Sequence, residues 1–133
     1  MRKYITSLLF LLFCAGISFA QDATTKIPRQ IFTTVEQAPA FPGGNDALKQ
    51  YLAKKIRYPK SAYQKDIEGK VVVRFIVEPD GSISDPEIIN SLDPDCDKET
   101  LRVIGKMPRW HPGRQNGAFV AAYYVLPVTF RLH

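Results

Sequence analysis

The stretch that most constrains the fold is the last one, Ala118 to Leu132 (AFVAAYYVLPVTFRL). Every even position in it is apolar, whereas the odd positions mix apolar residues with Pro127, Thr129 and Arg131. A period of two predicts a strand with one face on a core and the other face partly solvated. Because proline cannot donate to a sheet ladder, Pro127 indicates that this strand lies at the edge of its sheet. An unpaired edge is a template for another chain, and this gives the first functional lead.

Two helical stretches are predicted in the first half of the chain. Apolar residues recur at i, i+4 and i+8 from Leu48 to Ile56, and the helix they predict should end before the pair Tyr58-Pro59. A second, shorter helix is expected over 59–67, with Gly69 at its end.

Alternating apolar residues over 70–78 and again over 83–89, joined by the turn signal Pro79-Asp80-Gly81, predict a hairpin. Asp93 is expected to cap a helix that ends before Pro108, and 109–117 is expected to be a loop. The predicted fold class is therefore α+β. We expect a two-layer sandwich in which a three-stranded antiparallel sheet, made of the hairpin and the long C-terminal edge strand, packs against two helices.

The start of the chain has the features of an export signal. Residues 1–20 combine a positive beginning, an apolar run and a small-x-small cleavage pattern ending at Ala20, so they are predicted to be a signal peptide. The alternative is an uncleaved anchor in the inner membrane, for which the apolar run is short. Residues 21–40 are polar and are predicted to be a flexible linker, which leaves 41–133 as the folded domain.

Charge and cysteine content exclude some functions. Loss of residues 1–20 lowers the number of Lys and Arg from 18 to 16 against 13 Asp and Glu, so the net charge falls from +5 to +3. This mild excess of positive charge does not indicate a protein that binds nucleic acid. Cys96 would then be the only cysteine, so no intrachain disulfide can form.

No catalytic group, metal site or cofactor is predicted. The acidic residues over 93–99 lack the glycine and glutamate of a calcium loop and are better explained as the first turn of a helix. The only histidines, His111 and His133, are too few and too far from other ligands for a zinc site. Trp110 is expected either to cover the edge of the core or to be an exposed contact residue.

Several stretches in the right order resemble the family of TonB C-terminal domains. They are a Tyr-Pro pair followed by a Gly-x-Val-x-Val strand, a hairpin with a Pro-Asp-Gly turn, a Trp-x-Pro-Gly corner and a final strand, over about 40–133. The residues that carry the resemblance are Tyr58, Pro59, Gly69, Asp80, Gly81, Trp110, Pro112 and Gly113.

The resemblance implies a periplasmic, non-enzymatic module. Such a domain binds the TonB box, a peptide near the N-terminus of an outer-membrane transporter, as an added strand. In the energising complex, an inner-membrane anchor works with ExbB/ExbD-type motor subunits.

On the free edge of the last strand, every second residue should direct its backbone N–H and C=O groups outward, where a guest strand can pair with them. Since proline has no N–H to lose, Pro127 belongs to this outward set, which comprises Ala121, Tyr123, Val125, Pro127, Thr129 and Arg131. Pro127 would interrupt the pairing. The alternatives are a soluble adaptor or self-associating homodimer without energy transduction, and a small-molecule binder at the Trp110–Asn116 loop.

Overall fold

The computed structural model describes residues 29–132. The predicted signal peptide and residues 21–28 of the predicted linker lie outside them. The elements, in chain order, are α2 (Asn45–Lys55), α3 (Lys60–Gln64), β1 (Gly69–Val77), β2 (Ile83–Asn90), α4 (Pro94–Ile104), β3 (Gly113–Gln115), β4 (Ala118–Val120) and β5 (Ala122–Phe130).

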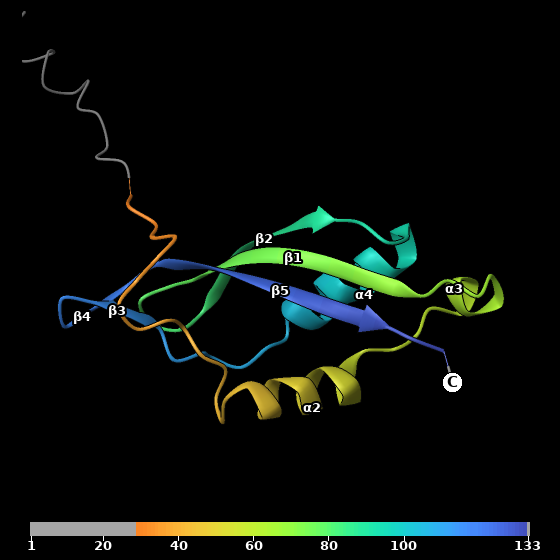
Figure 1. The fold of residues 1–133 in the computed structure, drawn as a ribbon, viewed down its shortest axis with the longest axis horizontal. Helices are drawn as coiled ribbons and strands as arrows, with labels where there is room; N and C mark the ends of the chain where they lie inside the picture. Colours follow the sequence, from red (N-terminus) through yellow and green to blue (C-terminus); the bar gives the residue numbers. More distant parts are fainter. Residues whose placement is uncertain (1–28, 133) are drawn as a thin grey trace, which may run out of the picture.

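The main sheet is three-stranded and antiparallel, in the order β2-β1-β5. Figure 1 shows β1 between the other two strands, with α4 crossing behind it. The predicted α+β class, the hairpin and the edge position of the last strand are confirmed. The short helix expected over 59–67 is present as α3, in addition to the two helices that were predicted to cover the sheet.

Local sequence explains where the helices begin. The carboxylate of Asp93 accepts hydrogen bonds from the backbone N–H groups of Asp95 and Cys96, so it caps α4 as predicted. Pro94 follows at the first helical position, where its missing N–H costs nothing. Gly69 lies at the start of β1 rather than at the end of a helix, because α3 already ends at Gln64.

The core lies between the sheet and the helices. Alternate residues of β1 and β5 point into it, and Leu48 of α2, Ala62 of α3 and Ile104 of α4 meet them. On β5 the even positions Leu126, Val128 and Phe130 are buried, whereas the odd positions from Val125 onward are exposed. The predicted two faces of the last strand are therefore present.

The predicted long strand is wrong at its beginning. Residues 118–120 form β4, which pairs with β3 in a separate two-stranded ribbon, and β5 begins only at Ala122. Asn116 and Gly117, with φ of 52° and 77°, make the two-residue turn between β3 and β4. Asn-Gly is the preferred pair for such a turn, so the sequence did contain the signal for this hairpin.

Residues 29–40, called the N-terminal segment below, lie on the domain. Phe32 bridges to β5, Gln37 to Arg114 of β3, and Ala40 to His111. In Figure 1 the segment crosses the start of β5 and runs along the β3–β4 ribbon before α2 begins. The described part of the predicted linker is thus attached to the fold through backbone contacts.

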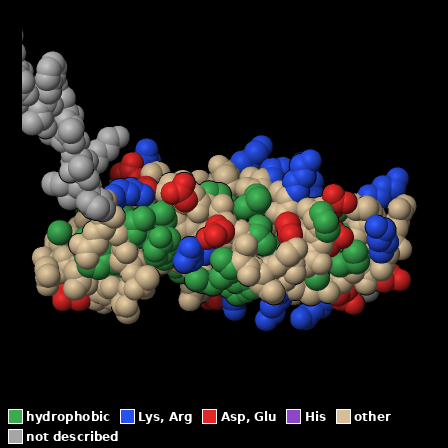
Figure 2. Space-filling model, turned by 90° about the horizontal axis from the view of Figure 1, so that it is seen from above, with side chains coloured by type: hydrophobic (Ala, Val, Ile, Leu, Met, Phe, Trp, Pro, Cys, Tyr) green, Lys and Arg blue, Asp and Glu red, His purple; other side chains and the backbone are tan. Residues whose placement is uncertain are grey.

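Charge on the visible surface is mixed. Figure 2 shows Lys and Arg side chains along both long margins of one face, with Asp and Glu between them. Ion pairs such as Arg74–Glu87, across β1 and β2, join opposite charges on the surface of the sheet.

Candidate functional site

The backbone of β5 turns alternate residues toward β1 and toward the free edge. The N–H of Phe32 donates to the carbonyl of Ala121, and the N–H of Tyr123 donates to the carbonyl of Phe32, both at 2.9 Å. Ala121 and Tyr123 therefore face away from β1. The pairing of β5 with β1 has no register shift from end to end, so the same alternation continues along the strand. It places Val125, Pro127 and Thr129, and Arg131 just beyond the strand, in the outward set.

The outward set divides into an occupied part and an open part. Phe32 occupies the outward backbone groups at Ala121 and Tyr123. From Val125 to Arg131, the outward N–H and C=O groups have no backbone partner within residues 29–132. We call this stretch the open edge. It is shorter than the set of six residues predicted from the sequence.

The other edge of the sheet is unsuited to strand pairing. Strand β2 contains Pro86, and Asp85 has a positive φ of 47°. Its register with β1 shifts twice. Bulges and prolines are the devices by which proteins blunt an edge strand. Strand β5 also contains a proline, Pro127, but its register with β1 has no bulge, so it is the edge that a guest strand can follow.

Side chains on the solvent face of the sheet form a short polar row beside the open edge. The guanidinium of Arg74 lies 4.5 Å from the centre of the Tyr123 ring. The same guanidinium donates to Glu87 at 2.8 Å. Val125 is half exposed next to this row. The row would present an aromatic ring, a cation and an apolar group to the side chains of a guest.

Three of the family-motif residues meet at the N-terminal end of β5. The N–H of Trp110 donates to the carbonyl of Gly81 at 2.8 Å. The ring of Trp110 is 3% exposed and packs on Tyr124 at 4.8 Å between ring centres. Gly113 is buried, and a Cβ there would lie 3.5 Å from the Cβ of Ala122. Trp110 covers the core, as one of its two predicted roles required, and it is not an exposed contact residue.

Asp80 holds the turn that carries Gly81. Its carboxylate accepts hydrogen bonds from the N–H and hydroxyl of Ser82 and forms an ion pair with Arg109 at 2.9 Å. These hydrogen bonds to Ser82, together with Arg109, hold the pKa of Asp80 well below its ordinary value. Pro112 is half-buried next to Gly113.

The other motif residues support the C-terminal end of β5. The hydroxyl of Tyr58 donates to the carbonyl of Ile67, and its ring packs edge-on against Phe130 at 5.7 Å. Pro59 caps α3, and Gly69 pairs with Phe130 across the sheet. The two groups of motif residues thus brace β5 at both ends. None of them belongs to the outward set itself.

A cleft of about 380 Å³ lies at the C-terminal end of the open edge. Ile56, Tyr58 and Tyr63 line one side of it, and Thr129 to Leu132 line the other. The ring of Tyr63 is 60% exposed. An apolar side chain of a guest that pairs with Thr129 would have this cleft within reach.

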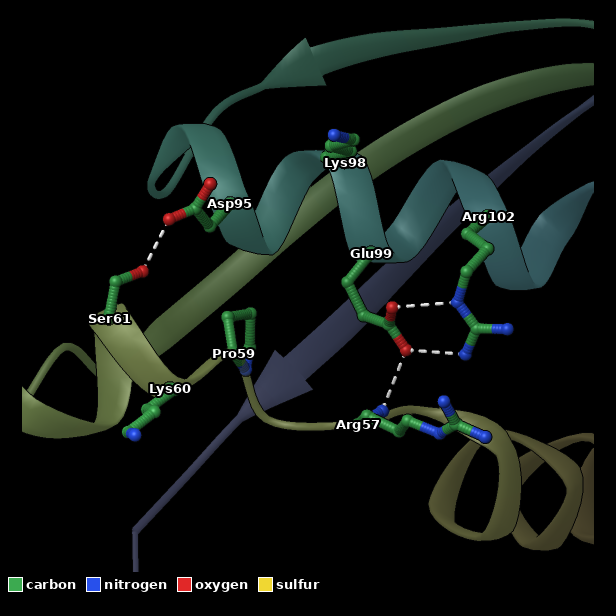
Figure 3. Close-up of a pocket in the computed structure, with 8 residues that line it drawn as sticks. All are labelled: Arg57, Pro59, Lys60, Ser61, Asp95, Lys98, Glu99 and Arg102. Atoms are coloured by element: carbon green, nitrogen blue, oxygen red, sulfur yellow. Dashed lines mark hydrogen bonds and ion pairs between the residues drawn. The ribbon is translucent and has the colours of Figure 1, made fainter.

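A second cleft, of about 430 Å³, lies where α3 and α4 meet (Figure 3). Glu99 accepts hydrogen bonds from the N–H of Arg57 and from the guanidinium of Arg102, and these bonds lower its pKa against the effect of burial. Figure 3 shows Lys60 and Lys98 pointing away from one another. The cleft is therefore a salt-linked junction between helices, and its two lysines do not converge on one point.

Residues 29–132 lack two kinds of feature. They contain no group of three side chains of the His, Cys, Asp or Glu type placed to hold a metal ion. No helix among them is both long and apolar enough to cross a membrane.

Phe32 is the contact that reasoning from sequence missed. It was placed in the predicted linker, because the region around it is polar and lacks a period. The signal available was the short run Ile31-Phe32, whose side chains are both half-buried. Two residues are too few for a periodic pattern, so the contact could not be predicted from hydrophobic spacing.

Comparison with known proteins gives one matching family and two similar solved folds. The family described as the Gram-negative bacterial TonB protein C-terminal domain matches residues 54–132. The fold is similar to the solution structure of the TonB C-terminal domain of Helicobacter pylori, with a TM-score of 0.51 and 23% identity, over 69% of this chain and 87% of that chain. A shorter form of the same domain gives a TM-score of 0.50 and 22% identity, over 64% of this chain and 89% of that one. No curated protein matches this chain.

Proposed function

The chain belongs to the family of Gram-negative bacterial TonB C-terminal domains, and from that premise we propose that it is a periplasmic protein-binding module. Its guest is the TonB-box peptide of an outer-membrane transporter, which adds to β5 as a further strand. The role is binding in TonB-dependent transport and not catalysis.

The open edge of β5 is the observation that carries this proposal. Its outward backbone groups from Val125 to Arg131 have no partner within the described chain, and the register behind them is uniform. Strand addition uses such groups for affinity and uses the alternate side chains for specificity. In this arrangement Val125 and Thr129 donate to the guest, and Pro127 offers only its carbonyl, so the ladder is interrupted in the middle.

Export and motor coupling belong to the same proposal. Residues 1–20 direct the chain out of the cytoplasm and are removed near Ala20. Any connection with ExbB/ExbD-type subunits then runs through other proteins. The module can deliver a partner to the transporter even if it does not itself transmit force.

A pair of variants at one position tests the proposal. Val125→Pro removes an outward N–H donor. Val125→Thr keeps this donor and replaces the side chain with one of similar size. Because the N–H of Val125 makes no bond to β1, the proline variant should keep the sheet, as Pro127 already does. Titration calorimetry is carried out with a synthetic TonB-box peptide from a transporter of the same organism. One lost backbone bond should weaken binding about fivefold to tenfold in the proline variant.

Circular dichroism of both variants serves as the control for folding. Equal affinity of the folded Val125→Pro protein and the wild-type protein would contradict strand addition at this edge. Absence of binding by the wild-type protein to the TonB-box peptides of that organism would contradict the partner class itself.

A further inference from the structure

The first rung of the β5 edge is already filled by the chain itself. Phe32 both donates to Ala121 and accepts from Tyr123, which is the pattern of a strand pairing in parallel with β5. The segment makes only this one bridge to β5 and then bends at Thr33 and Thr34. It therefore occupies the place where a longer guest would continue along the strand.

The N-terminal segment is held on both sides of Phe32. The guanidinium of Arg29 makes two hydrogen bonds to the carboxylate of Glu78, one of them at 2.9 Å. On the other side, the backbone of Gln37 exchanges two hydrogen bonds with Arg114, at 3.1 and 2.9 Å. The backbone of Ala40 does the same with His111, at 3.0 and 2.8 Å.

The side chain of Glu36 adds a further tie. Its carboxylate accepts from the N–H of Asn116 at 2.8 Å, while its own N–H donates to the side chain of Gln115 at 2.9 Å. These bonds reach the turn of the β3–β4 ribbon. Each backbone hydrogen bond contributes about 0.5–1.5 kcal/mol. Displacement of the whole segment would therefore lose more free energy than a guest would gain by pairing with Ala121 and Tyr123.

We propose that the N-terminal segment is a built-in stop that closes one end of the β5 edge and thereby sets the register of the guest. The inference rests on the proposed function. A guest pairs from Val125 toward Arg131 and ends where Phe32 begins, and it does not displace Phe32. At its other end it meets the cleft lined by Tyr58, Tyr63 and Thr129. The surface thus fits a short extended peptide and excludes a long continuous strand.

The family match supports treating this device as an addition to the domain. It begins at residue 54, after the N-terminal segment and most of α2. The stop therefore lies in a part of the chain that the matched family region does not include.

The test is amide hydrogen exchange in the whole exported chain, with and without a synthetic ten-residue TonB-box peptide from a transporter of the same organism. The wild type is compared with Arg29→Gln/Phe32→Pro, which removes both the ion pair and the donor to Ala121. Arg109→Gln is the matched control, since it breaks an exposed Arg–carboxylate ion pair that does not involve the N-terminal segment.

In the wild type and in the control, the amides of Phe32 and Tyr123 should stay protected when the peptide binds. In the double variant, the amide of Tyr123 should exchange at least tenfold faster without peptide and regain protection when the peptide is added. If the amide of Phe32 in the wild type loses protection when the peptide binds, the peptide displaces the N-terminal segment. This result would contradict the proposed stop. So would an unprotected Tyr123 amide in the peptide-bound double variant. If the peptide binds neither form, the proposed function fails and the stop fails with it.

Discussion

Gly81 lies where a side chain cannot fit. Its φ is +89°, and a Cβ built on it would come within 2.2 Å of the carbonyl oxygen of Trp110. The same glycine accepts the N–H of Trp110 and so joins the β1–β2 turn to the corner that covers the core. Because the atom in the way belongs to the backbone, relief requires the corner itself to move.

The substitution Gly81→Ala should therefore destabilise the fold strongly. We expect a loss of roughly 3 kcal/mol in the free energy of unfolding, from the strained φ together with the clash. Gly117→Ala is the matched control, since its φ of +77° is similar but nothing lies within 4 Å of the added Cβ. It should cost about 1 kcal/mol. Urea denaturation measures both, and equal losses would contradict the contact with Trp110.

Cys96 should be chemically inert in the folded protein. It is fully buried, and burial together with the negative charge of Asp93 raises the pKa of its thiol to about 11. Since the thiolate is the reactive form, thiol reagents should label the chain beginning at Gln21 slowly at pH 8 and rapidly in urea. Rapid labelling of the native protein would show that α4 opens readily or that the thiol is accessible.

At the scale of elements, β5 shows what sequence reasoning can and cannot predict. Its alternation of faces follows directly from Leu126, Val128 and Phe130, and the edge position follows from Pro127. The start of the strand was misplaced, because apolar residues at 118–120 continue the same period although they belong to β4. Local pattern does not reveal a change of pairing partner. The Asn116-Gly117 turn was the only local sign of it.

The candidate site was predictable to a similar degree. The identity of the outward-facing residues depends on β5 having no bulge. The register between β1 and β5 has no shift, so this condition is met. The occupation of Ala121 and Tyr123 by Phe32 is a contact between residues far apart in the chain. Such a contact leaves no periodic trace in a polar segment, so only the three-dimensional structure contains it.

Attachment of the N-terminal segment should depend on pH. Hydrogen bonds from Arg29 lower the pKa of Glu78, with Ser84 helping and burial opposing. A carboxyl whose pKa is lower in the folded state than in the unfolded state stabilises the fold at pH values above its unfolded-state pKa. This contribution is lost as the pH falls through the folded-state pKa. Below about pH 4, the amide of Phe32 should therefore lose protection before the core does.

Hydrogen exchange followed from pH 7 to pH 3 measures this effect. In Arg29→Gln the pH dependence at Phe32 should be much smaller, because the ion pair is already absent. An identical pH profile in the wild type and in Arg29→Gln would show that Glu78 does not hold the segment.

At the scale of the whole molecule, the folded unit begins before the predicted boundary at residue 41. Three pairs of backbone hydrogen bonds attach the N-terminal segment to the rest, and Pro39 is buried. The segment covers both the start of β5 and the outer side of β3. It therefore contributes to stability as well as to the shape of the β5 edge.

Removal of the segment should weaken the fold. A chain that begins at Phe41 is expected to lose about 3 kcal/mol or more in the free energy of unfolding, from six backbone bonds at about 0.5 kcal/mol or more each. A chain that begins at Arg29 should match one that begins at Gln21. Urea denaturation compares the three, and equal stability of all of them would mean that the segment is only loosely attached.

Under strand addition, a guest peptide pairs with the open edge of β5 through its backbone. The most direct measurement is a scan in which each amide of a TonB-box peptide is N-methylated in turn and its affinity for the chain is measured. Strand addition predicts losses that alternate along the peptide, about fivefold to tenfold at every second position, where the peptide N–H donates to the outward carbonyl of Val125, Pro127 or Thr129, and little effect at the positions in between. A flat profile, or losses at consecutive positions, would contradict the account.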